Sequence, residues 1–212
     1  MVLCLHGEDP GDDVFCLDRE ERFLQTLDWI VDAFPNLRVV LEHLSSAAAV
    51  EFVQSHPSPM LGATVTAHHL ELTLDDVIGD KLMPHHFCKP IAKGPQDRMA
   101  LIEAVVQPGQ TKFFLGTDSA PHERSVKECA CGAAGVFTAP LAMPLLAEIF
   151  EREDALPQLE QFSSVNGAQF YGLPQNEEEI TLDREEWIVP EQYDGVVPLR
   201  AGKTIQWKIR EE

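Results

Sequence analysis

The sequence has few basic residues and no long hydrophobic run. Its 212 residues contain 16 Lys and Arg against 35 Asp and Glu, which gives a formal net charge of −19. This excess of negative charge argues against non-specific binding to nucleic acid or to an anionic membrane surface. No apolar stretch approaches the roughly 18 residues of a membrane helix, and the first residues lack the basic region of a secretory signal. We therefore expect no membrane span and no nucleic-acid partner.

Cysteine is also scarce, and its pattern does not suggest a disulfide scaffold. The five cysteines are an odd number in no repeating frame, which favours a reduced, cytoplasmic compartment. Cys129 and Cys131 are two residues apart, but without a second such pair we expect reduced, partly buried thiols rather than a metal site. Because 44% of the residues are hydrophobic and 24% are charged, the chain can form a folded core.

Four short apolar runs have the length and the unbroken hydrophobicity of buried parallel strands. They cover residues 2–5, 37–41, 61–66 and 112–115. Helical patterns lie between them, and alternating strands and helices predict a parallel sheet, either open or closed into a barrel. The first run begins directly after Met1, which we interpret as a sign that an earlier half of the fold lies upstream.

The expected helices are defined by apolar spacing and by residues typical of helix ends. Asp18 and Glu21 predict a capping box before the first helix, and Pro95 is typical of a helix start. Pro144 should disturb the helix that contains it. The expected helical segments are residues 23–34, 47–53, 95–106, 141–150 and 156–162.

The tail of the chain differs in character from the rest. It is acidic at residues 177–179 and then shows short alternating runs near residues 187–189 and 204–209. We interpret residues 174–212 as a terminal wrap or small hairpin that follows a larger unit formed by residues 1–173.

Polar residues of the kind that bind metals follow the predicted strands. His6 ends the first run, His43 follows the second, and Asp118 follows the fourth. The carboxyl ends of parallel strands meet on one face, which is where the active site of a TIM barrel lies. Two imidazoles and a carboxylate are also the ligands that zinc takes in catalytic sites. Their separation by tens of residues means that spacing alone is not a zinc signature.

Several motifs, in their order along the chain, carry a family resemblance. They are residues 6–8 (HGE), 41–44 (LEHL), 63–70 (ATVTAHHL), 88–93 (CKPIAK), 114–122 (FLGTDSAPH), 135–140 (GVFTAP) and 164–173 (SVNGAQFYGL). Together they closely resemble the homodimeric, PyrC-type dihydroorotases of the amidohydrolase superfamily. The match covers nearly the whole chain, and the segment containing Asp118 is its most specific part.

The resemblance implies an α/β fold, a (β/α)8 TIM barrel of which this chain supplies roughly the carboxyl-terminal four strand-helix units and a short tail. It implies a cytoplasmic, zinc-dependent enzyme of pyrimidine biosynthesis. The reaction is the reversible cyclisation of N-carbamoyl-L-aspartate to (S)-dihydroorotate. Family members hold two zinc ions bridged by a carboxylated lysine and a hydroxide, and the full-length protein is expected to be a homodimer.

The resemblance also implies roles for individual residues. His6 and His43 would bind the more exposed zinc, whereas Asp118 would bind the buried zinc and move the proton as general base and acid. His122 would hold the substrate carboxylate. Further substrate contacts, largely through the backbone, are expected from Lys89, Ala120 and Ala134.

The chain departs from the family pattern in ways that affect the predicted activity. The His-x-His pair of the first barrel strand, the arginine and asparagine that hold the substrate, and the bridging lysine are all absent. Asp9 and Pro10 stand where a threonine is expected, and Lys89 stands where many members have leucine. Two alternatives therefore remain, which are another cyclic amidase or deaminase of the superfamily and a non-catalytic truncated product.

Other polar residues are interpreted structurally at this stage. The resemblance assigns no metal role to His68 and His69, and we expect one of them to form a hydrogen bond near the sheet edge. His85 and His86 are expected in a loop, and residues 113–114 in the core.

Overall fold

The fold is built around a four-stranded parallel sheet, as the computed structural model describes it for residues 1–210. The strands follow one another in space in chain order, and each pairs in parallel with the next. They are β1 (Val2–His6), β2 (Arg38–Glu42), β3 (Leu61–Val65) and β4 (Phe113–Leu115). All four predicted strands are therefore confirmed, with ends that differ by one residue.

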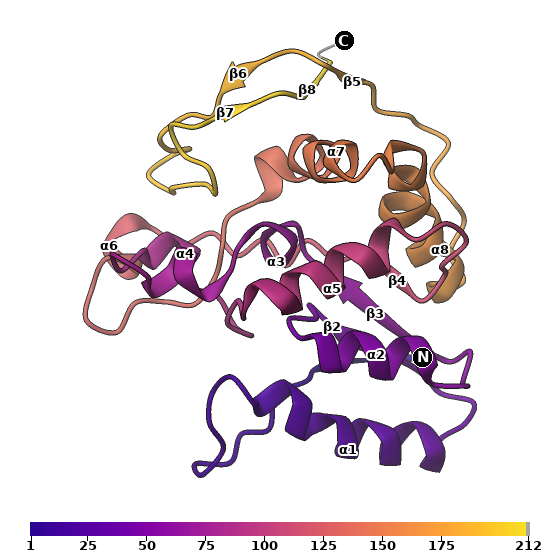
Figure 1. Ribbon diagram of the computed structural model, residues 1–212. Coiled ribbons are helices and arrows are strands. Elements are labelled where there is room, and N and C mark those ends of the chain that lie inside the picture. The colour runs from indigo at the N-terminus through magenta and orange to yellow at the C-terminus, as the bar shows by residue number, and fades with distance from the viewer. Residues whose placement is uncertain (211–212) are drawn as a thin grey trace.

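Helices between the strands form a layer that follows the order of the sheet (Figure 1). The longer helices are α1 (Arg19–Ala33), α2 (Ala47–Ser55), α5 (Pro95–Val106) and α7 (Ala142–Arg152). Shorter α-helices are α3 (Ala67–Glu71), α4 (Leu74–Ile78), α6 (Arg124–Lys127) and α8 (Asn166–Tyr171). Single turns of 3-10 helix lie at Pro84–His86, Ala139–Leu141 and Leu156–Gln158, and a π-helix spans Gln161–Val165.

The predicted capping box before α1 is wrong. Asp18 precedes the helix, but its side chain makes no capping hydrogen bond. Its backbone is already helical, with φ −94° and ψ −8°, whereas a capping side chain normally requires an extended backbone. The amide of Asp18 instead closes a turn onto the carbonyl of Phe15, at 2.9 Å.

Two further helix predictions need correction. Pro144 does not disturb α7, because it is the third residue of that helix and lies in the first turn, where backbone N–H groups have no partner inside the helix. Residues 156–162 form no α-helix. They contain the 3-10 turn Leu156–Gln158 and the start of the π-helix Gln161–Val165. That π-helix leads to Asn166, whose buried side chain donates to the carbonyl oxygens of Gln110 and Phe113 before and in β4.

The core lies between the sheet and the helices, and a cluster of aromatic side chains lies between β4 and α8. Phe113 and Phe114 are almost fully buried, as predicted. The ring of Phe114 packs 5.4 Å from Phe170 and 5.5 Å from Tyr171, both in α8. Gly62 in β3 makes this contact possible, because a Cβ there would lie 2.8 Å from the Phe170 ring. The sheet and α8 are thus fixed against each other.

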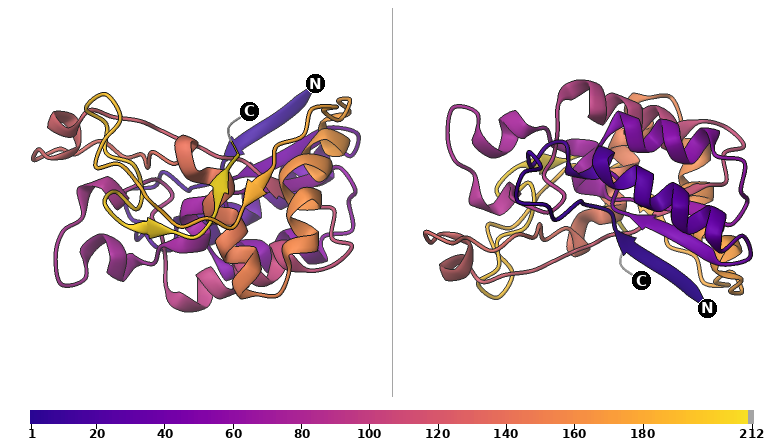
Figure 2. Two further views of the ribbon diagram at one scale, coloured as in Figure 1. Left: turned by 90° about the horizontal axis from the view of Figure 1, so that it is seen from above. Right: turned by 90° about the horizontal axis from the view of Figure 1, so that it is seen from below.

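Strand β1 lies at the edge of the sheet (Figure 2). It pairs with β2 from Val2–Arg38 to His6–Glu42, and no strand within residues 1–210 pairs with its other edge. Its residues are partly buried or exposed, whereas every residue of β3 is buried.

The tail forms two small antiparallel ladders over α7 (Figure 1). They pair β5 (Leu182–Asp183) with β8 (Lys208–Ile209), and β6 (Trp187–Ile188) with β7 (Thr204–Ile205). The indole N–H of Trp207 donates to Glu151 of α7 at 3.0 Å, which attaches the tail to the helix layer.

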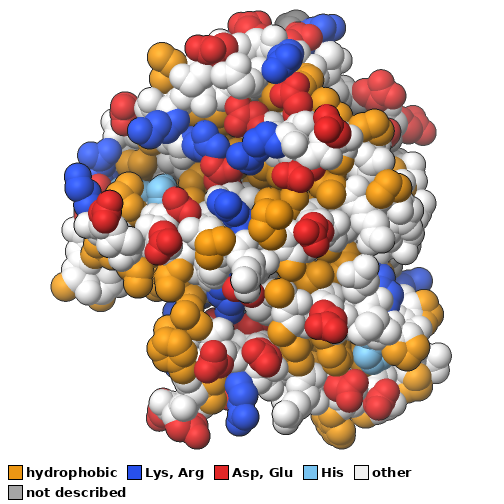
Figure 3. Space-filling model, viewed as in Figure 1, with side chains coloured by type: hydrophobic (Ala, Val, Ile, Leu, Met, Phe, Trp, Pro, Cys, Tyr) orange, Lys and Arg blue, Asp and Glu red, His pale blue; other side chains and the backbone are white. Residues whose placement is uncertain are grey.

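Lys and Arg gather mainly in the upper half of the face in Figure 3, while acidic side chains are spread over it. Within residues 1–210, no helix is both long enough and apolar enough to cross a membrane.

Candidate functional site

The structure brings His6 and His43 together at the carboxyl end of the sheet. His6 is the last residue of β1, and His43 directly follows β2. Because the two strands are parallel neighbours, these positions lie side by side. Nδ1 of His6 is 3.1 Å from Nε2 of His43, and the ring centroids are 4.7 Å apart. The two imidazole nitrogens therefore face each other at hydrogen-bond distance.

His43 is held in a strained and buried position. Its backbone has φ 44°, a left-handed conformation that is uncommon for a residue other than glycine. The backbone N–H donates to the hydroxyl of Thr64 in β3 at 2.7 Å, which fixes this turn. Burial, assisted by the neighbouring His6, lowers the pKa of His43 to about 4. The ring is therefore neutral near pH 7, as a metal ligand must be.

His6 is more exposed and is oriented by a carboxylate. Its Nε2 lies 2.8 Å from Oε2 of Glu8, two residues further along the chain. A carboxylate on the ring nitrogen opposite to the ligand nitrogen is a recurring arrangement around metal-binding histidines. The sequence motif HGE thus has a physical explanation, since Glu8 orients the His6 ring toward His43.

Asp118 occupies the corresponding position after β4. It also has a left-handed backbone, with φ 41°, three residues beyond the end of the strand. Partial burial raises the pKa of its carboxyl, the nearby Glu42 carboxylate raises it further, and His6 lowers it. The electrostatic influence of Glu42 and His6 indicates that Asp118 faces the same end of the sheet as the histidine pair.

These donors fit a zinc ion. Two nitrogens bound to tetrahedral zinc at about 2.0–2.1 Å lie about 3.3 Å from each other, close to the observed spacing of 3.1 Å. The other ring nitrogen of His43, Nδ1, is buried without a hydrogen-bond partner. Two neutral imidazoles with a carboxylate nearby also match the ligand types of catalytic zinc.

A second group of possible ligands lies deeper. Single donor atoms of His68, His69 and Cys88 lie within 4.8 Å of one another, and all three residues are buried. No spacing in the sequence joins them, since Cys88 reaches α3 only through the path of the loop that precedes it. His69 already contacts the hydroxyl of Thr66 and the carbonyl of Pro90, each at 2.9 Å.

Cys88 and His68 differ in their bonding within this group. The thiol of Cys88 donates to Pro90 at 3.2 Å, and burial raises its pKa to about 12. Both ring nitrogens of His68 lack a partner, and burial lowers its pKa well below the usual value. Metal binding here would therefore require a proton to leave Cys88 and existing hydrogen bonds of His69 to break.

The predicted substrate-binding positions lie on three loops that are joined by hydrogen bonds. Nε2 of His122 is 3.1 Å from the carbonyl oxygen of Ala134, and the amide of Ala120 donates to the carbonyl of Val136 at 3.1 Å. A carbonyl oxygen only accepts, so Nε2 of His122 carries the proton in this bond. Lys89 is exposed between two buried residues, and its loop is joined to the others by the bond from the Gly135 amide to the Phe87 carbonyl, at 2.8 Å.

Two other features lie outside this site. Cys129 and Cys131 are exposed, with sulfur atoms 3.8 Å apart, so their predicted partial burial is wrong. They lie in the loop after α6, where little of the chain covers them.

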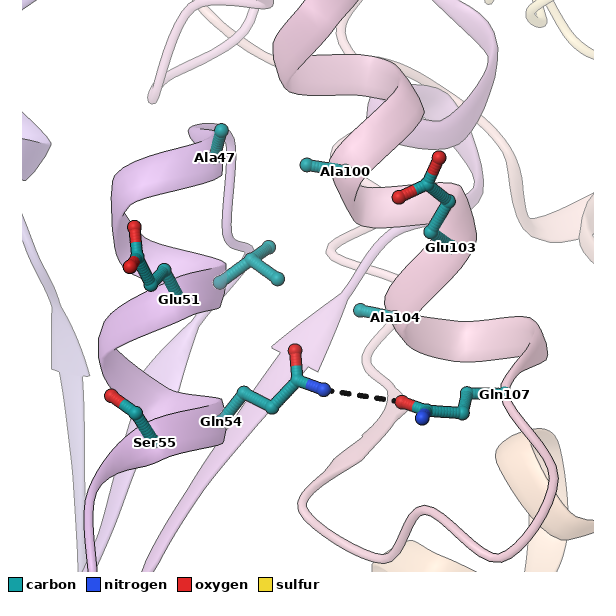
Figure 4. Close-up of a pocket in the computed structure, with 9 residues that line it drawn as sticks. Ala47, Glu51, Gln54, Ser55, Ala100, Glu103, Ala104 and Gln107 are labelled. Atoms are coloured by element: carbon teal, nitrogen blue, oxygen red, sulfur yellow. Dashed lines mark hydrogen bonds between the residues drawn. The ribbon is translucent and has the colours of Figure 1, made fainter.

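A groove of about 590 Å³ runs between α2 and α5, and Gln54 and Gln107 are hydrogen-bonded across it at 3.1 Å (Figure 4). No predicted site residue lines this groove.

Known proteins that resemble the chain over nearly its whole length are dihydroorotases. It is 50% identical to a dihydroorotase of Aromatoleum aromaticum over 215 residues, which cover 99% of this chain and 62% of that protein. A mitochondrial dihydroorotase of Arabidopsis thaliana is 46% identical, with 98% of this chain and 56% of that protein covered. The chain thus spans about three fifths of the length of these curated relatives. No protein-family model matches it.

Solved structures agree with this similarity. Dihydroorotase of Saccharomyces cerevisiae in complex with 5-fluoroorotic acid has a TM-score of 0.91 and 37% identity, over 99% of this chain and 63% of that one. The Campylobacter jejuni dihydroorotase has a TM-score of 0.87 and 39% identity, over 100% and 60%. An Arthrobacter aurescens hydantoinase, at 17% identity and a TM-score of 0.76, shares the fold alone. The chain is therefore similar to PyrC-like dihydroorotases over nearly its whole length, and it spans about three fifths of theirs.

Proposed function

We propose that this chain forms part of a dihydroorotase, which interconverts N-carbamoyl-L-aspartate and (S)-dihydroorotate with release or uptake of water in UMP biosynthesis. The observation that carries the proposal is the 3.1 Å approach of the His6 and His43 nitrogens at the carboxyl end of a parallel sheet. In the complete protein, the four strands would be one arc of a (β/α)8 barrel. Residues 1–173 would belong to this barrel and residues 174–212 to a terminal wrap.

His6 and His43 would hold one zinc ion, and Asp118 would hold the other. When bound, zinc supplies Lewis-acid activation of the amide carbonyl and lowers the pKa of an attacking water. The remaining ligands of a two-metal site, and the arginine and asparagine for the substrate, would come from residues outside these 212. A homodimer and a cytoplasmic location are further proposals for the complete protein.

Asp118 would transfer the proton during turnover. In the hydrolytic direction it accepts a proton from the water that adds to the ring amide carbonyl. The carbon–nitrogen bond then breaks, and Asp118 returns the proton to the leaving ring nitrogen. The carboxyl must be ionised to accept that proton, and a bound zinc ion would favour the ionised form.

The loops that carry Ala120, His122 and Ala134 would bind the substrate. His122 would donate a hydrogen bond to the substrate carboxylate. Since Nε2 donates to Ala134 in this structure, the carboxylate would bind at a protonated Nδ1, or the ring would turn away from Ala134. Lys89, Ala120 and Ala134 would add backbone contacts. The relative crystallised with 5-fluoroorotic acid supports an orotate-like ligand.

The direct test is a substrate assay on the complete protein loaded with zinc. We expect carbamoyl-aspartate cyclisation and dihydroorotate hydrolysis, with no turnover of 5-substituted hydantoins. Turnover of hydantoins but not of dihydroorotate would identify another cyclic amidase instead. A zinc-loaded, folded complete protein without activity on either substrate would support the non-catalytic alternative.

A further inference from the structure

Lys127, at the end of α6, is a buried lysine bound only to backbone carbonyl oxygens. The residue is 3% exposed. Its Nζ donates to Phe87 at 2.9 Å, to Ala133 at 2.7 Å and to Gly135 at 2.6 Å. An ammonium group has three donors, and all three are used here. Burial lowers the pKa of Lys127 to about 8, as expected for a cation whose partners are neutral.

The three carbonyls lie beside the proposed substrate-binding positions. Ala133 and Gly135 are the residues on either side of Ala134, and Phe87 is two residues before Lys89. The loop around Lys89 and the loop around Ala134 are far apart in sequence. One ammonium group therefore joins two of the segments from which backbone contacts to the substrate are proposed.

Gly135 extends this connection to the remaining two positions. Its φ is 149°, and a Cβ added to it would lie 2.7 Å from Cβ of Ala120 and 3.0 Å from Cδ2 of His122. The backbone of Gly135 is thus packed directly against Ala120 and His122. A shift of the Gly135 carbonyl, released from Lys127, would move the surface on which both of these residues rest.

We propose that Lys127 is a positioning residue for substrate binding, holding the Lys89 and Ala134 loops in the spacing that the pyrimidine ring and its carboxylate require. This inference rests on the proposed dihydroorotase function. Lys127 touches no proposed metal ligand. It acts through the backbone of residues that would contact the substrate.

Lys112 provides a matched control within the same chain. It is also a lysine that binds only carbonyls, those of Val53 at 2.9 Å and of His56. It lies directly before β4, at the opposite end of the sheet from His6, His43 and Asp118. Loss of Lys112 should therefore reduce stability without altering the substrate loops.

The experiment compares Lys127→Met with Lys112→Met in the complete, zinc-loaded protein. For Lys127→Met we expect the KM for dihydroorotate to rise about tenfold or more, with kcat within about threefold of the parent. For Lys112→Met we expect an unchanged KM. Hydrogen exchange at the amides of Gly135 and Ala120 should accelerate at least about tenfold in Lys127→Met alone. Lys127→Arg, which keeps a charged donor, should recover part of the KM.

Each other result decides against the proposal. Equal effects of the two Met variants on KM and on amide exchange would make Lys127 a general anchor of the fold. Failure of every Lys127 variant to fold, while Lys112→Met folds, would lead to the same conclusion. If the parent protein has no dihydroorotase activity, the proposed function fails. Amide exchange then still shows whether Lys127 orders these loops, and unchanged exchange would overturn the inference separately.

Discussion

Oε2 of Glu8 lies 2.8 Å from Nε2 of His6, on the side of the ring opposite the nitrogen that faces His43. This contact fixes the direction of a ring that is otherwise largely exposed, with 46% of its side chain accessible. It also assigns the proton, since a carboxylate only accepts, so Nδ1 of a neutral His6 is the unprotonated nitrogen, which accepts from Nε2 of His43 in this structure and would bind the metal in its place.

We therefore expect Glu8→Gln to weaken zinc binding about 10–100-fold, because the neutral amide accepts a weaker hydrogen bond from Nε2 and no longer raises the basicity of the ligand nitrogen. Competition with a chromophoric chelator measures the zinc dissociation constant. Glu21→Gln, an exposed change of the same type in α1, is the control and should leave it unaltered. Equal zinc affinity in both variants would mean that Glu8 has no role in holding the ligand.

Asp118→Asn should abolish turnover in the complete protein while substrate binding remains measurable. The amide has the shape of the carboxylate but cannot accept the proton of the attacking water, and loss of a general base typically costs about 10²–10⁴-fold in rate. Steady-state kinetics and calorimetric titration with dihydroorotate separate the two effects. Near-normal turnover by the variant would remove Asp118 from the proposed mechanism.

The four strands, and the strand ends at which the candidate site lies, could be predicted from the sequence because both are encoded by neighbouring residues. Each strand is a short apolar run, and the polar residue that follows it marks the point where the chain leaves the core. The contact between His6 and His43 then follows from parallel pairing. Asp18 shows where such signals fail, because the preceding turn fixes its backbone in a helical conformation and prevents capping.

The long-range contacts of the site could not be predicted in this way. Cys88 meets His68 and His69 only because a loop returns to α3, and no spacing in the sequence encodes that return. Similarly, nothing in the sequence distinguishes Lys127 from other charged residues. Its three carbonyl partners are defined by the path of two loops rather than by residue type.

His122→Ala should weaken binding of dihydroorotate and carbamoyl-aspartate more than it weakens binding of zinc. His122 lies on the loop four residues after Asp118 and contacts Ala134 rather than the histidine pair. A charge-assisted hydrogen bond to a carboxylate contributes about 1.5–3 kcal/mol, so substrate affinity should fall about 10–100-fold. Calorimetry with substrate and chelator competition for zinc test this. Loss of zinc with normal substrate binding would reverse the assignment.

A buried ion pair connects α1 to the segment before α5 and should make stability depend on pH. Glu20 is 1% exposed, its Oε1 accepts the amide of Ser45 at 2.9 Å, and its Oε2 lies 3.9 Å from Nζ of Lys93. Burial raises the pKa of the Glu20 carboxyl, although Lys93 opposes this shift. A raised pKa means that the folded state holds the proton more tightly than the unfolded state. The contribution of Glu20 to the free energy of unfolding is therefore complete at low pH, and it is lost as the pH rises through the pKa of the folded state.

Lys93→Met removes the charge that opposes this shift. We expect a loss of about 3 kcal/mol in the free energy of unfolding at pH 7.5, and a smaller loss at pH 5, because the raised pKa of Glu20 favours the uncharged carboxyl as the pH falls. Urea unfolding at the two pH values provides the measurement. Adding Glu20→Gln to Lys93→Met should remove most of the pH dependence of the loss. A loss that is larger at pH 5 than at pH 7.5 would contradict this account.

The 212-residue chain, purified alone, should be inactive as a dihydroorotase and should bind zinc less tightly than the complete protein. It spans about 62% of the length of the Aromatoleum relative, and the proposed second metal site retains only Asp118. His6 and His43 should still capture one zinc, since their nitrogens already converge.

The buried cluster of His68, His69 and Cys88 is the competing site, so His43→Ala and His68→Ala are compared. We expect His43→Ala to abolish zinc binding and His68→Ala to leave it intact, as measured by metal content and chelator competition. Retention of zinc by His43→Ala and its loss from His68→Ala would assign the metal to the buried cluster. Full activity with two tightly bound zinc ions would show that residues of this chain replace the ligands expected from elsewhere.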